Sequence, residues 1–386
     1  MKLFNRNISF SELKSELQYQ QSRRLGWLNR IMLWLNYFCI LSIILSYTAR
    51  YINPNAFWPL AFFGLGYPIL FILNVFFIIY WFAQMRVIGL WSVLALSIGW
   101  NSFFSYFQFN LSSTAPTNKD VKVMSYNCML FDLYNWSHNK KSRELIFDML
   151  QEESPDILCL QEFFTSEAKN HFNNTDTLTE FLSAKNIHTE YAITLRGTDH
   201  WGVATLSKYP VVKKGKILFN TNSNNICIYT DVIINRDTVR IYNVHLASIH
   251  FGKKEYKFID DIIHDKSTEE IEGSKNILRH LKLAFVKRSE QVAIVSEHIA
   301  ACKYKKIVCG DFNDTPSSFA YRKIKGDMQD AFMESGSGIG RTYAGKLPAL
   351  RIDYILYSEN FESYNYKHFP ETYTDHYPIS CYLKVK

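Results

Sequence analysis

The sequence predicts an α/β domain behind a membrane-inserted N-terminal third. Three long apolar segments lie between residues 31 and 109, and they contain almost no charge. A strand, a helix and a second strand then follow one another between Val121 and Glu162, which is the order of an α/β unit. From Tyr191 onward several short apolar strands are separated by turn signals.

Composition limits the function classes. The chain has 386 residues, of which 47% are hydrophobic and 16% aromatic, and the apolar excess is concentrated in residues 31–109. The net charge of +7 comes partly from a basic N-terminus, so it is weak evidence for nucleic-acid binding. The seven cysteines show no paired CxxC or Cys/His spacing, which argues against a zinc site.

The N-terminal third predicts a three-helix transmembrane anchor. Residues 1–30 form a basic segment, and the apolar segments that follow cover about 31–48, 57–82 and 87–106. Each is close to the ~20 residues that cross a bilayer core, and tryptophans lie mostly toward their ends. Three segments exclude a cleaved signal peptide, and the lack of charged faces argues against a soluble helical bundle. We therefore expect an integral, multi-pass protein of the plasma (inner) membrane.

Orientation follows from loop charge. The basic residues 1–30 are expected in the cytoplasm, so an odd number of spans places everything after Asn110 in the periplasm or outside the cell. Pro59 and Pro68 lie in the second segment, and a re-entrant second segment would reverse this orientation. The polar, proline-containing residues 110–120 predict a linker to the domain of residues 121–386.

Nine polar residues between positions 121 and 386 share one feature: each lies in or near the end of a predicted strand. Each alone has an ordinary explanation, such as a turn residue, a surface charge or a core histidine. Together they supply oxygen ligands and imidazoles without cysteine, which suits Mg²⁺ or Mn²⁺ better than zinc. P-loop, GxSxG and HExxH motifs are absent. The nine residues are Asn127, Glu162, Asn243, His245, Asp311, Asn313, Asp353, Asp375 and His376.

Six stretches around these residues resemble, in order and spacing, the endonuclease/exonuclease/phosphatase superfamily with its deoxyribonuclease-I-like fold. The resemblance covers roughly residues 120–386 and points to a membrane-anchored member of bacterial type. It implies a four-layered α/β sandwich with two packed mixed β-sheets. The stretches are Ser125-Tyr126-Asn127, Leu160-Gln161-Glu162, Asn243-Val244-His245-Leu246, Gly310-Asp311-Phe312-Asn313, Arg351-Ile352-Asp353-Tyr354-Ile355-Leu356 and Thr374-Asp375-His376-Tyr377-Pro378.

The resemblance also implies a role for each residue. Glu162 would hold the metal, with Asn127 beside it and Asp375 at the same cation. Asp311 would orient or deprotonate the attacking water. His376, held by Asp353, would contact the scissile phosphate. The groups that bind the substrate phosphate would be His245, Asn243 and Asn313, and the catalytic set would be His245, Asp311, Asn313, Asp353 and His376. Thr374 stands where many members have serine.

The function expected from these features is a membrane-anchored, Mg²⁺-dependent phosphoesterase that hydrolyses phosphodiester or phosphomonoester bonds by attack of water, with Mn²⁺ as the alternative cation. The substrate stays open between nucleic acid and phospholipid. The first alternative is a sphingomyelinase-like or other lipid head-group phosphodiesterase rather than a nuclease. The second is a catalytically inactive, membrane-tethered binding module, which the presence of Glu162, Asp311 and His376 disfavours. No obligate protein partner is evident from the sequence.

Overall fold

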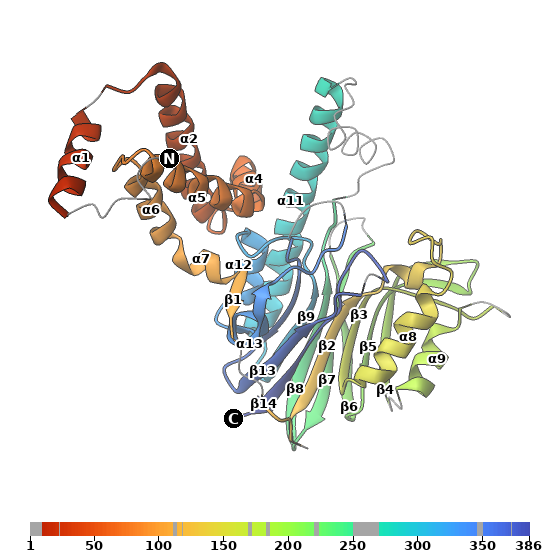
Figure 1. Cartoon of the computed structure of the whole chain (residues 1–386). Helices are drawn as coiled ribbons and strands as arrows, with labels where there is room; N and C mark the ends of the chain where they lie inside the picture. Colours follow the sequence, from red (N-terminus) through yellow and green to blue (C-terminus); the bar gives the residue numbers. More distant parts are fainter. Residues whose placement is uncertain are drawn as a thin grey trace.

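Two mixed β-sheets packed face to face lie at the centre of the computed structural model (Figure 1). It describes residues 10–22, 24–110, 114–117, 119–168, 172–182, 186–219, 224–249, 270–345, 350–371 and 373–386. The charged residues 251–274 predict an inserted helical or mobile region, and of these residues 251–269 lie outside the described part of the chain.

The first sheet has the strand order β13–β14–β2–β3–β5–β4. Its single parallel pair is β2 with β3, and its other neighbours are antiparallel. Its strands are β13 (Phe361–His368), β14 (Ile379–Val385), β2 (Val121–Asn127), β3 (Ile157–Ser166), β5 (Asp199–Ser207) and β4 (Asn186–Leu195).

The second sheet repeats this plan with the order β10–β12–β9–β8–β7–β6, and its single parallel pair is β8 with β9. Its strands are β10 (Gln329–Asp330), β12 (Asp353–Tyr357), β9 (Lys305–Asp311), β8 (Asp237–His245), β7 (Ile226–Ile234) and β6 (Val211–Ile217). In both sheets the parallel pair brings the carboxyl ends of two central strands to the same edge.

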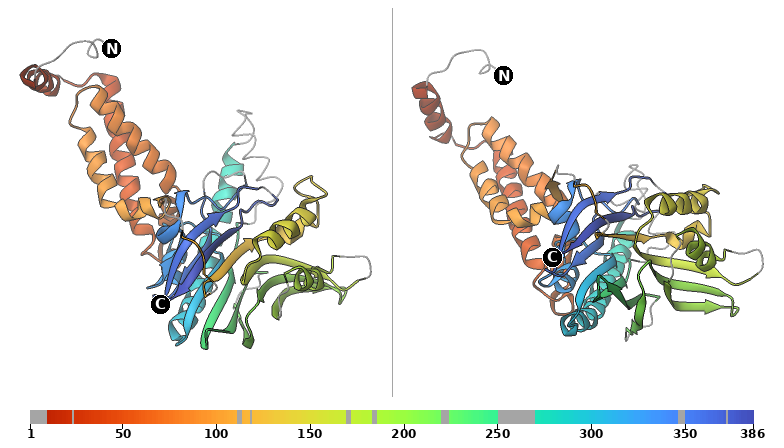
Figure 2. Two further views of the ribbon diagram at one scale, coloured as in Figure 1. Left: turned by 60° about the horizontal axis from the view of Figure 1, so that its bottom comes forward. Right: turned by 90° about the horizontal axis from the view of Figure 1, so that it is seen from below.

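Helices cover the outer face of each sheet and complete the four layers (Figure 2). On the first sheet lie α8 (Ser142–Glu153) and α9 (Asn174–Phe181), and on the second lie α11 (Glu270–Ala301) and α12 (Phe319–Lys325). Between the sheets the core is built from alternating apolar residues of both, such as Val123, Cys159 and Ile241. Short elements complete the domain: η1 (Met129–Asp132), α13 (Ala331–Ser335) and β11 (Ser337–Ile339). The predicted α/β fold with two mixed sheets is confirmed.

The N-terminal helices correct the prediction of three full-length membrane spans. Among the described residues, only the 23-residue α2 is a single helix long and apolar enough to cross a membrane. The second segment bends by 66° between α4 and α5, where Gly66 separates the two helices. In the third, α6 has only 10 residues and ends at Gly99, against which the Tyr47 ring packs. The helices are α1 (Phe10–Ser22), α2 (Trp27–Ala49), α3 (Pro54–Phe57), α4 (Pro59–Leu65), α5 (Tyr67–Ala83), α6 (Gly89–Ile98) and α7 (Trp100–Phe104).

The helical bundle packs directly against the α/β domain. The short strand β1 (Phe107–Phe109) pairs with β11, and the Tyr106 hydroxyl lies 3.2 Å from the Ser317 hydroxyl. Gly64 packs so closely on Ser317 that a Cβ there would lie 3.0 Å from the Ser317 carbonyl oxygen. Of the predicted linker, residues 114–117 are exposed coil, and residues 111–113 and 118 lie outside the described part. The chain therefore contacts the domain before the linker begins.

Candidate active site

Three neighbouring strands of the second sheet place three of the predicted site residues in one row. Asp311 ends β9, and its Cα partner on β12 is Asp353. On the other side, its partner on the parallel strand β8 is His245. Because side chains at paired positions point to the same face of a sheet, the register alone brings these three groups together.

Gly310 explains why a glycine precedes Asp311. Its φ of +147° lies outside the range of ordinary residues, and a Cβ at this position would lie 1.9 Å from the Val244 carbonyl oxygen. The parallel pairing of β8 with β9 passes through this contact, because Val244 and Gly310 are Cα partners. The glycine therefore permits the register that places Asp311 beside His245.

The first sheet contributes Asn127 and Glu162 from the ends of its parallel pair. Asn127 is the last residue of β2, and its Cα partner is Gln161. Glu162 follows at an irregularity in the pairing of β3 with β5, where its φ is +47°. A non-glycine residue at positive φ costs free energy, and an irregularity of this kind redirects a side chain. Its carboxylate lies with the residues of the second sheet.

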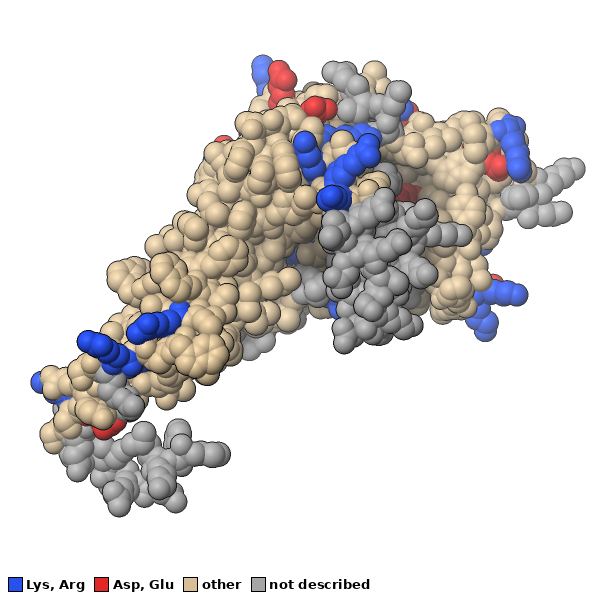
Figure 3. Space-filling model, turned by 90° about the horizontal axis from the view of Figure 1, so that it is seen from above, with Lys and Arg blue, Asp and Glu red and all other residues tan. Residues whose placement is uncertain are grey.

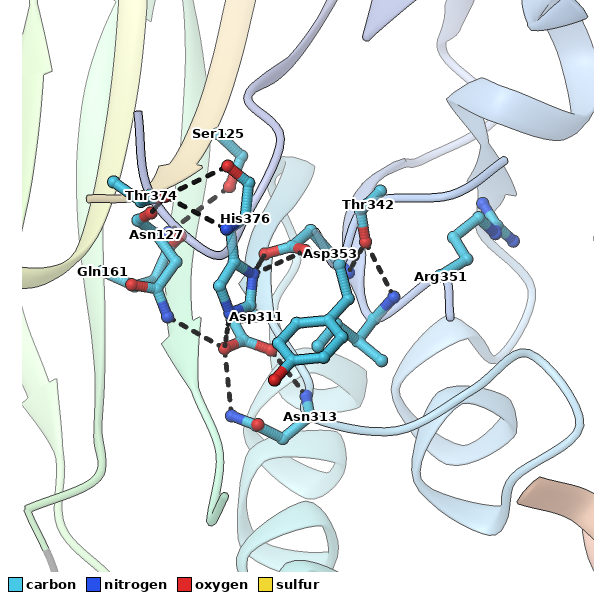
Figure 4. A network of polar contacts seen from close by, with 12 residues as sticks. Ser125, Asn127, Gln161, Asp311, Asn313, Thr342, Arg351, Asp353, Thr374 and His376 are labelled. Carbon is cyan, nitrogen blue, oxygen red and sulfur yellow. Dashed lines mark hydrogen bonds and ion pairs between the residues drawn. The ribbon is translucent and has the colours of Figure 1, made fainter. Parts of the chain in front are cut away.

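Asn127 joins the two sheets at the site. Its amide nitrogen donates to Asp311 Oδ2 at 3.0 Å and to Glu162 Oε1 at 3.3 Å. The amide oxygen accepts from the Met129 backbone nitrogen at 3.1 Å. His245 Nε2 lies 3.7 Å from Glu162 Oε1 and 3.9 Å from Asp311 Oδ2. The strand ends of both sheets thus meet in one polar cluster, part of which Figure 4 shows.

His376 enters this cluster from the loop before β14. Its Nδ1 lies 3.1 and 3.0 Å from the two carboxylate oxygens of Asp353, and its Nε2 lies 3.7 Å from Asp311 Oδ2 (Figure 4). Burial alone would lower the pKa of His376, but the carboxylates of Asp353 and Asp311 outweigh it and raise the pKa well above the usual range. The imidazolium form is therefore favoured at neutral pH.

Asp311 has a different protonation environment. Burial raises its pKa to about 6, and the neighbouring His376 opposes this shift. Its two oxygens accept hydrogen bonds from the backbone and the side chain of Asn313, at 2.7 and 3.0 Å. A carboxylate whose pKa lies close to neutrality is suited to take a proton from water.

Two residues that the sequence analysis assigned no chemical task hold His376 and Asp353 in place. The Thr374 hydroxyl accepts from the His376 backbone nitrogen at 3.0 Å and lies 3.2 Å from the Asn127 carbonyl oxygen. The Thr342 hydroxyl accepts from the backbone nitrogens of Ile352 and Asp353 at 2.9 and 3.0 Å. Thr374 lies in a quoted motif, whereas Thr342 lies in a glycine-rich loop that carries no recognisable signal.

Asn243 differs from its expected role as a phosphate-binding residue. It is fully buried, and its amide nitrogen donates to the backbone oxygens of Leu160 and Ala204 at 3.1 and 2.9 Å. Its oxygen accepts from Gln161 Nε2 at 2.7 Å. These bonds connect β8 of the second sheet to β3 and β5 of the first. Asn243 therefore fixes the strand that carries His245. Its spacing to His245 in the sequence does not distinguish these two tasks.

The donor set fits a hard divalent cation at the accessible side of the cluster. The Glu162 side chain is 32% exposed, whereas that of Asp311 is 1% exposed. Asp375 is half-buried and follows Thr374 on the same loop. Asp311, Asp353 and His376 also lie within ligand distance of one another, but His376 Nδ1 already bonds both oxygens of Asp353. Carboxylate oxygens are the ligands Mg²⁺ prefers, and Glu162 offers an accessible one.

A family model agrees with this geometry. Residues 124–376 match the Endonuclease/Exonuclease/phosphatase family. The chain belongs to this family. As a member, it is a metal-dependent hydrolase that acts on phosphoester bonds. A second model, described as a Domain of unknown function (DUF8431), matches residues 29–106, and no curated protein matches the chain.

Solved structures resemble this chain at low sequence identity. An endonuclease/exonuclease/phosphatase from Beutenbergia cavernae is 16% identical, with a TM-score of 0.51 over 69% of this chain and 72% of that chain. A mannosyl-6-phosphatase from Bacteroides thetaiotaomicron is 17% identical, with a TM-score of 0.49 over 68% of this chain and 99% of its own. The human Nocturnin catalytic domain is 16% identical, with a TM-score of 0.47 over 70% and 97%. At this identity the likeness concerns the fold alone.

Proposed function

We propose that this protein is a membrane-anchored, Mg²⁺-dependent phosphoesterase that uses water as its nucleophile. The observation that carries the proposal is the cluster in which Asp311 lies within 3.7 Å of His376 Nε2 and is bonded through Asn127 to Glu162. It combines a carboxylate base, an imidazolium and an accessible carboxylate. Hydrolysis of a phosphoester needs these three kinds of group.

The protein residues divide the reaction between them. Asp311, in its ionised form, accepts the proton of the attacking water. His376 and His245 stabilise the negative charge that develops on the phosphoryl oxygens and the leaving oxygen. Asp353 holds His376 protonated and oriented, and Asn313 holds Asp311. Glu162 and Asp375, with Asn127 beside them, would hold the cation, which would supply further charge neutralisation.

The polarity of the helical bundle supports a membrane location. Its buried positions include several polar residues, and Asn36 donates to the Ser92 hydroxyl at 2.6 Å and accepts from the Trp81 indole nitrogen at 2.9 Å. Its outward positions are large and apolar, as on α2, α5 and α6. Figure 3 shows the bundle as a nearly uncharged surface between the domain and a few basic residues near its far end. Buried polar groups that bond one another, beneath an apolar exterior, are typical of helices packed in lipid.

Orientation rests on α2 alone. If α2 spans the bilayer, residues 50–65 lie on the side opposite to the N-terminus, and the domain packs against residues 51–65. Arg24, Arg30 and Arg86 lie at the far end of the bundle and indicate a cytoplasmic far end. The domain would then be periplasmic or extracellular. This orientation does not depend on whether α5 and α6 also cross.

The substrate class is best separated by a panel in which the full chain in detergent is given one substrate at a time. The panel contains single- and double-stranded DNA, RNA, sphingomyelin, phosphoinositides and generic nitrophenyl mono- and diesters, each with and without Mg²⁺. We expect hydrolysis that requires Mg²⁺ and that falls at least ~10²-fold in Asp311→Ala and His376→Ala. Asp237→Ala, which removes an exposed carboxylate, is the matched control.

Each result has a defined meaning. Full activity in Asp311→Ala and His376→Ala would refute the site assignment. Hydrolysis of lipids without hydrolysis of nucleic acids would favour the head-group phosphodiesterase over the nuclease. A protein that binds Mg²⁺ but cleaves nothing in the panel would favour the inactive binding module.

A further inference from the structure

Residues 275–289 of α11 carry a concentration of positive charge, whereas Glu270 and Glu272 precede them at the start of the helix. Residues 275–289 contain five lysines and arginines and no aspartate or glutamate, as the printed sequence shows. In Figure 1 this end of α11 extends beyond the ends of the neighbouring strands. Figure 3 looks onto this end of the molecule and shows lysine and arginine side chains gathered on it.

Helical spacing places cations and leucines on one face. Five residues at the spacing i, i+3, i+4, i+7 and i+8 are all exposed, and Leu278 and Leu283 among them are 46% and 54% exposed. The opposite face packs on the protein through Leu281, Ala284 and Phe285, which are buried. We call the exposed face the cationic face; it consists of Lys275, Leu278, Arg279, Lys282 and Leu283.

The cationic face continues the surface of the helical bundle. Lys282 Nζ lies 5.2 Å from the centre of the Trp58 ring, and the rings of Phe285 and Phe62 are 5.2 Å apart. Trp58 lies between α3 and α4 and Phe62 lies in α4, in the segment that follows α2 at the end of the bundle nearest the domain. Tryptophan at such an end is typical of the bilayer interface, where amphipathic helices with lysine and arginine also lie.

We propose that the cationic face of α11 rests on an anionic phospholipid surface. Lys275, Arg279 and Lys282 attract the lipid phosphates, and Leu278 and Leu283 enter the interface between them. The proposal rests on the membrane anchor proposed above, and it is independent of the reaction that the site performs.

The same helix holds the loops of the catalytic site. Arg288 donates to the Ala247 carbonyl oxygen at 2.9 Å and to Asp314 at 3.1 Å, and Gln291 accepts from the Ala247 backbone nitrogen at 2.8 Å. Ala247 follows His245, and Asp314 follows Asn313. From Lys282 to Arg288 the helix rises by about 9 Å. Lipid contact would therefore set the height of the catalytic loops above the bilayer.

The test uses the full chain reconstituted into vesicles of phosphatidylcholine, alone or mixed with phosphatidylglycerol. A fluorophore is attached at Leu278→Cys, and its quenching by nitroxide-labelled lipid is measured. The seven native cysteines are buried, so the unmodified protein measures background labelling. Val212→Cys on β6, which is 59% exposed at the opposite edge of the second sheet, is the matched control.

We expect quenching at position 278 that requires phosphatidylglycerol and weakens in high salt, and no quenching at position 212. Lys275→Gln and Arg279→Gln should each weaken the contact about fivefold, or about 1 kcal/mol. Lys213→Gln on β6 should leave it unchanged.

Equal quenching of the labels at positions 278 and 212, or quenching that does not depend on lipid charge and salt, would overturn the inference while leaving the anchor intact. Loss of the unmodified protein from the vesicles in an alkaline wash would overturn the anchor, and the inference with it. Hydrolytic activity enters neither measurement, so failure of the proposed reaction is a separate outcome.

Discussion

At the scale of single residues, the protonation of the site depends on Asp353. This carboxylate raises the pKa of His376, while burial raises the pKa of Asp311 to about 6. Activity should therefore fall as the pH drops through about 6, because Asp311 becomes protonated, and a cation beside it would move this limit downward. On the alkaline side activity should be lost when His376 loses its proton.

Asp353→Asn tests the alkaline limit. Removing the carboxylate lowers the pKa of His376, so the loss of activity should move to lower pH, and the maximal rate should fall about 10²- to 10⁴-fold. The measurement is the dependence of kcat/KM on pH. Asp237→Asn is the control, and an unchanged alkaline limit in Asp353→Asn would contradict the assigned pairing.

Gly310→Ala tests the backbone contact beneath the site. A Cβ would meet the Val244 carbonyl oxygen at 1.9 Å, so β8 and β9 must separate and stability should fall by about 3 kcal/mol or more. Gly197→Ala is a control for conformation alone, because its φ is +74° and its Cβ would meet nothing within 4 Å; it should cost only about 1–2 kcal/mol. Thermal unfolding in detergent measures both, and equal losses would show that the close contact is unimportant.

At the scale of elements, a buried ion pair positions β12. Arg351, which lies two residues before Asp353, donates to both oxygens of Asp330 at 2.9 and 2.7 Å. The Tyr321 hydroxyl adds a third bond to this carboxylate at 2.6 Å. Burial alone would raise the pKa of Asp330, but the Arg351 guanidinium outweighs it and holds the pKa below its usual range. The pair thus connects α12, β10 and the strand that carries Asp353.

Asp330→Asn should lower stability by about 3–5 kcal/mol, because it leaves the buried Arg351 guanidinium without its counter-charge. The contribution of Asp330 is present above its unfolded pKa of about 4 and is lost as the pH falls through its lower folded pKa. The variant should therefore lose less stability than the parent protein on acidification. Asp237→Asn, in an exposed pair with Lys305, should change stability by no more than about 1 kcal/mol. Similar losses in the two variants would contradict this account.

Elements also show what the sequence can predict. The strand ends that carry Asp311, His245 and Asp353 are recognisable because an apolar run and a polar residue are both local signals. The redirected Glu162 side chain is not recognisable, because the irregularity in β3 depends on pairing with β5. Likewise, the buried hydrogen bonds of Asn243 are made to β3 and β5 of the other sheet, which come from distant parts of the sequence. The lengths of α5 and α6 were misjudged because hydropathy does not record where Gly66 and Gly99 end a helix.

At the scale of the whole molecule, the sequence predicts a domain boundary near residue 110 but not the contact between the helical bundle and the α/β domain. Composition changes near residue 110, which is a local signal. The contacts of Tyr106 with Ser317 and of Phe62 with Phe285 join residues more than 200 positions apart. The local sequence around one partner does not predict the other partner. The domain is consequently held beside the helical bundle by packed surfaces, and the polar residues 110–120 do not by themselves fix this arrangement.

The pairing of β1 with β11 has one more consequence, for a chain that is cut. Residues 114–117 are exposed, so a protease site placed there should be cleaved without unfolding either side. The two fragments should still elute together in mild detergent and separate only under denaturation. The reason is that β1, Tyr106 and Phe62 of the smaller, N-terminal fragment remain packed on the larger one. Cleavage at an equivalent site after residue 22 should release only the N-terminal peptide. Fragments that separate at once would mean that only the covalent chain keeps the helical bundle and the α/β domain together.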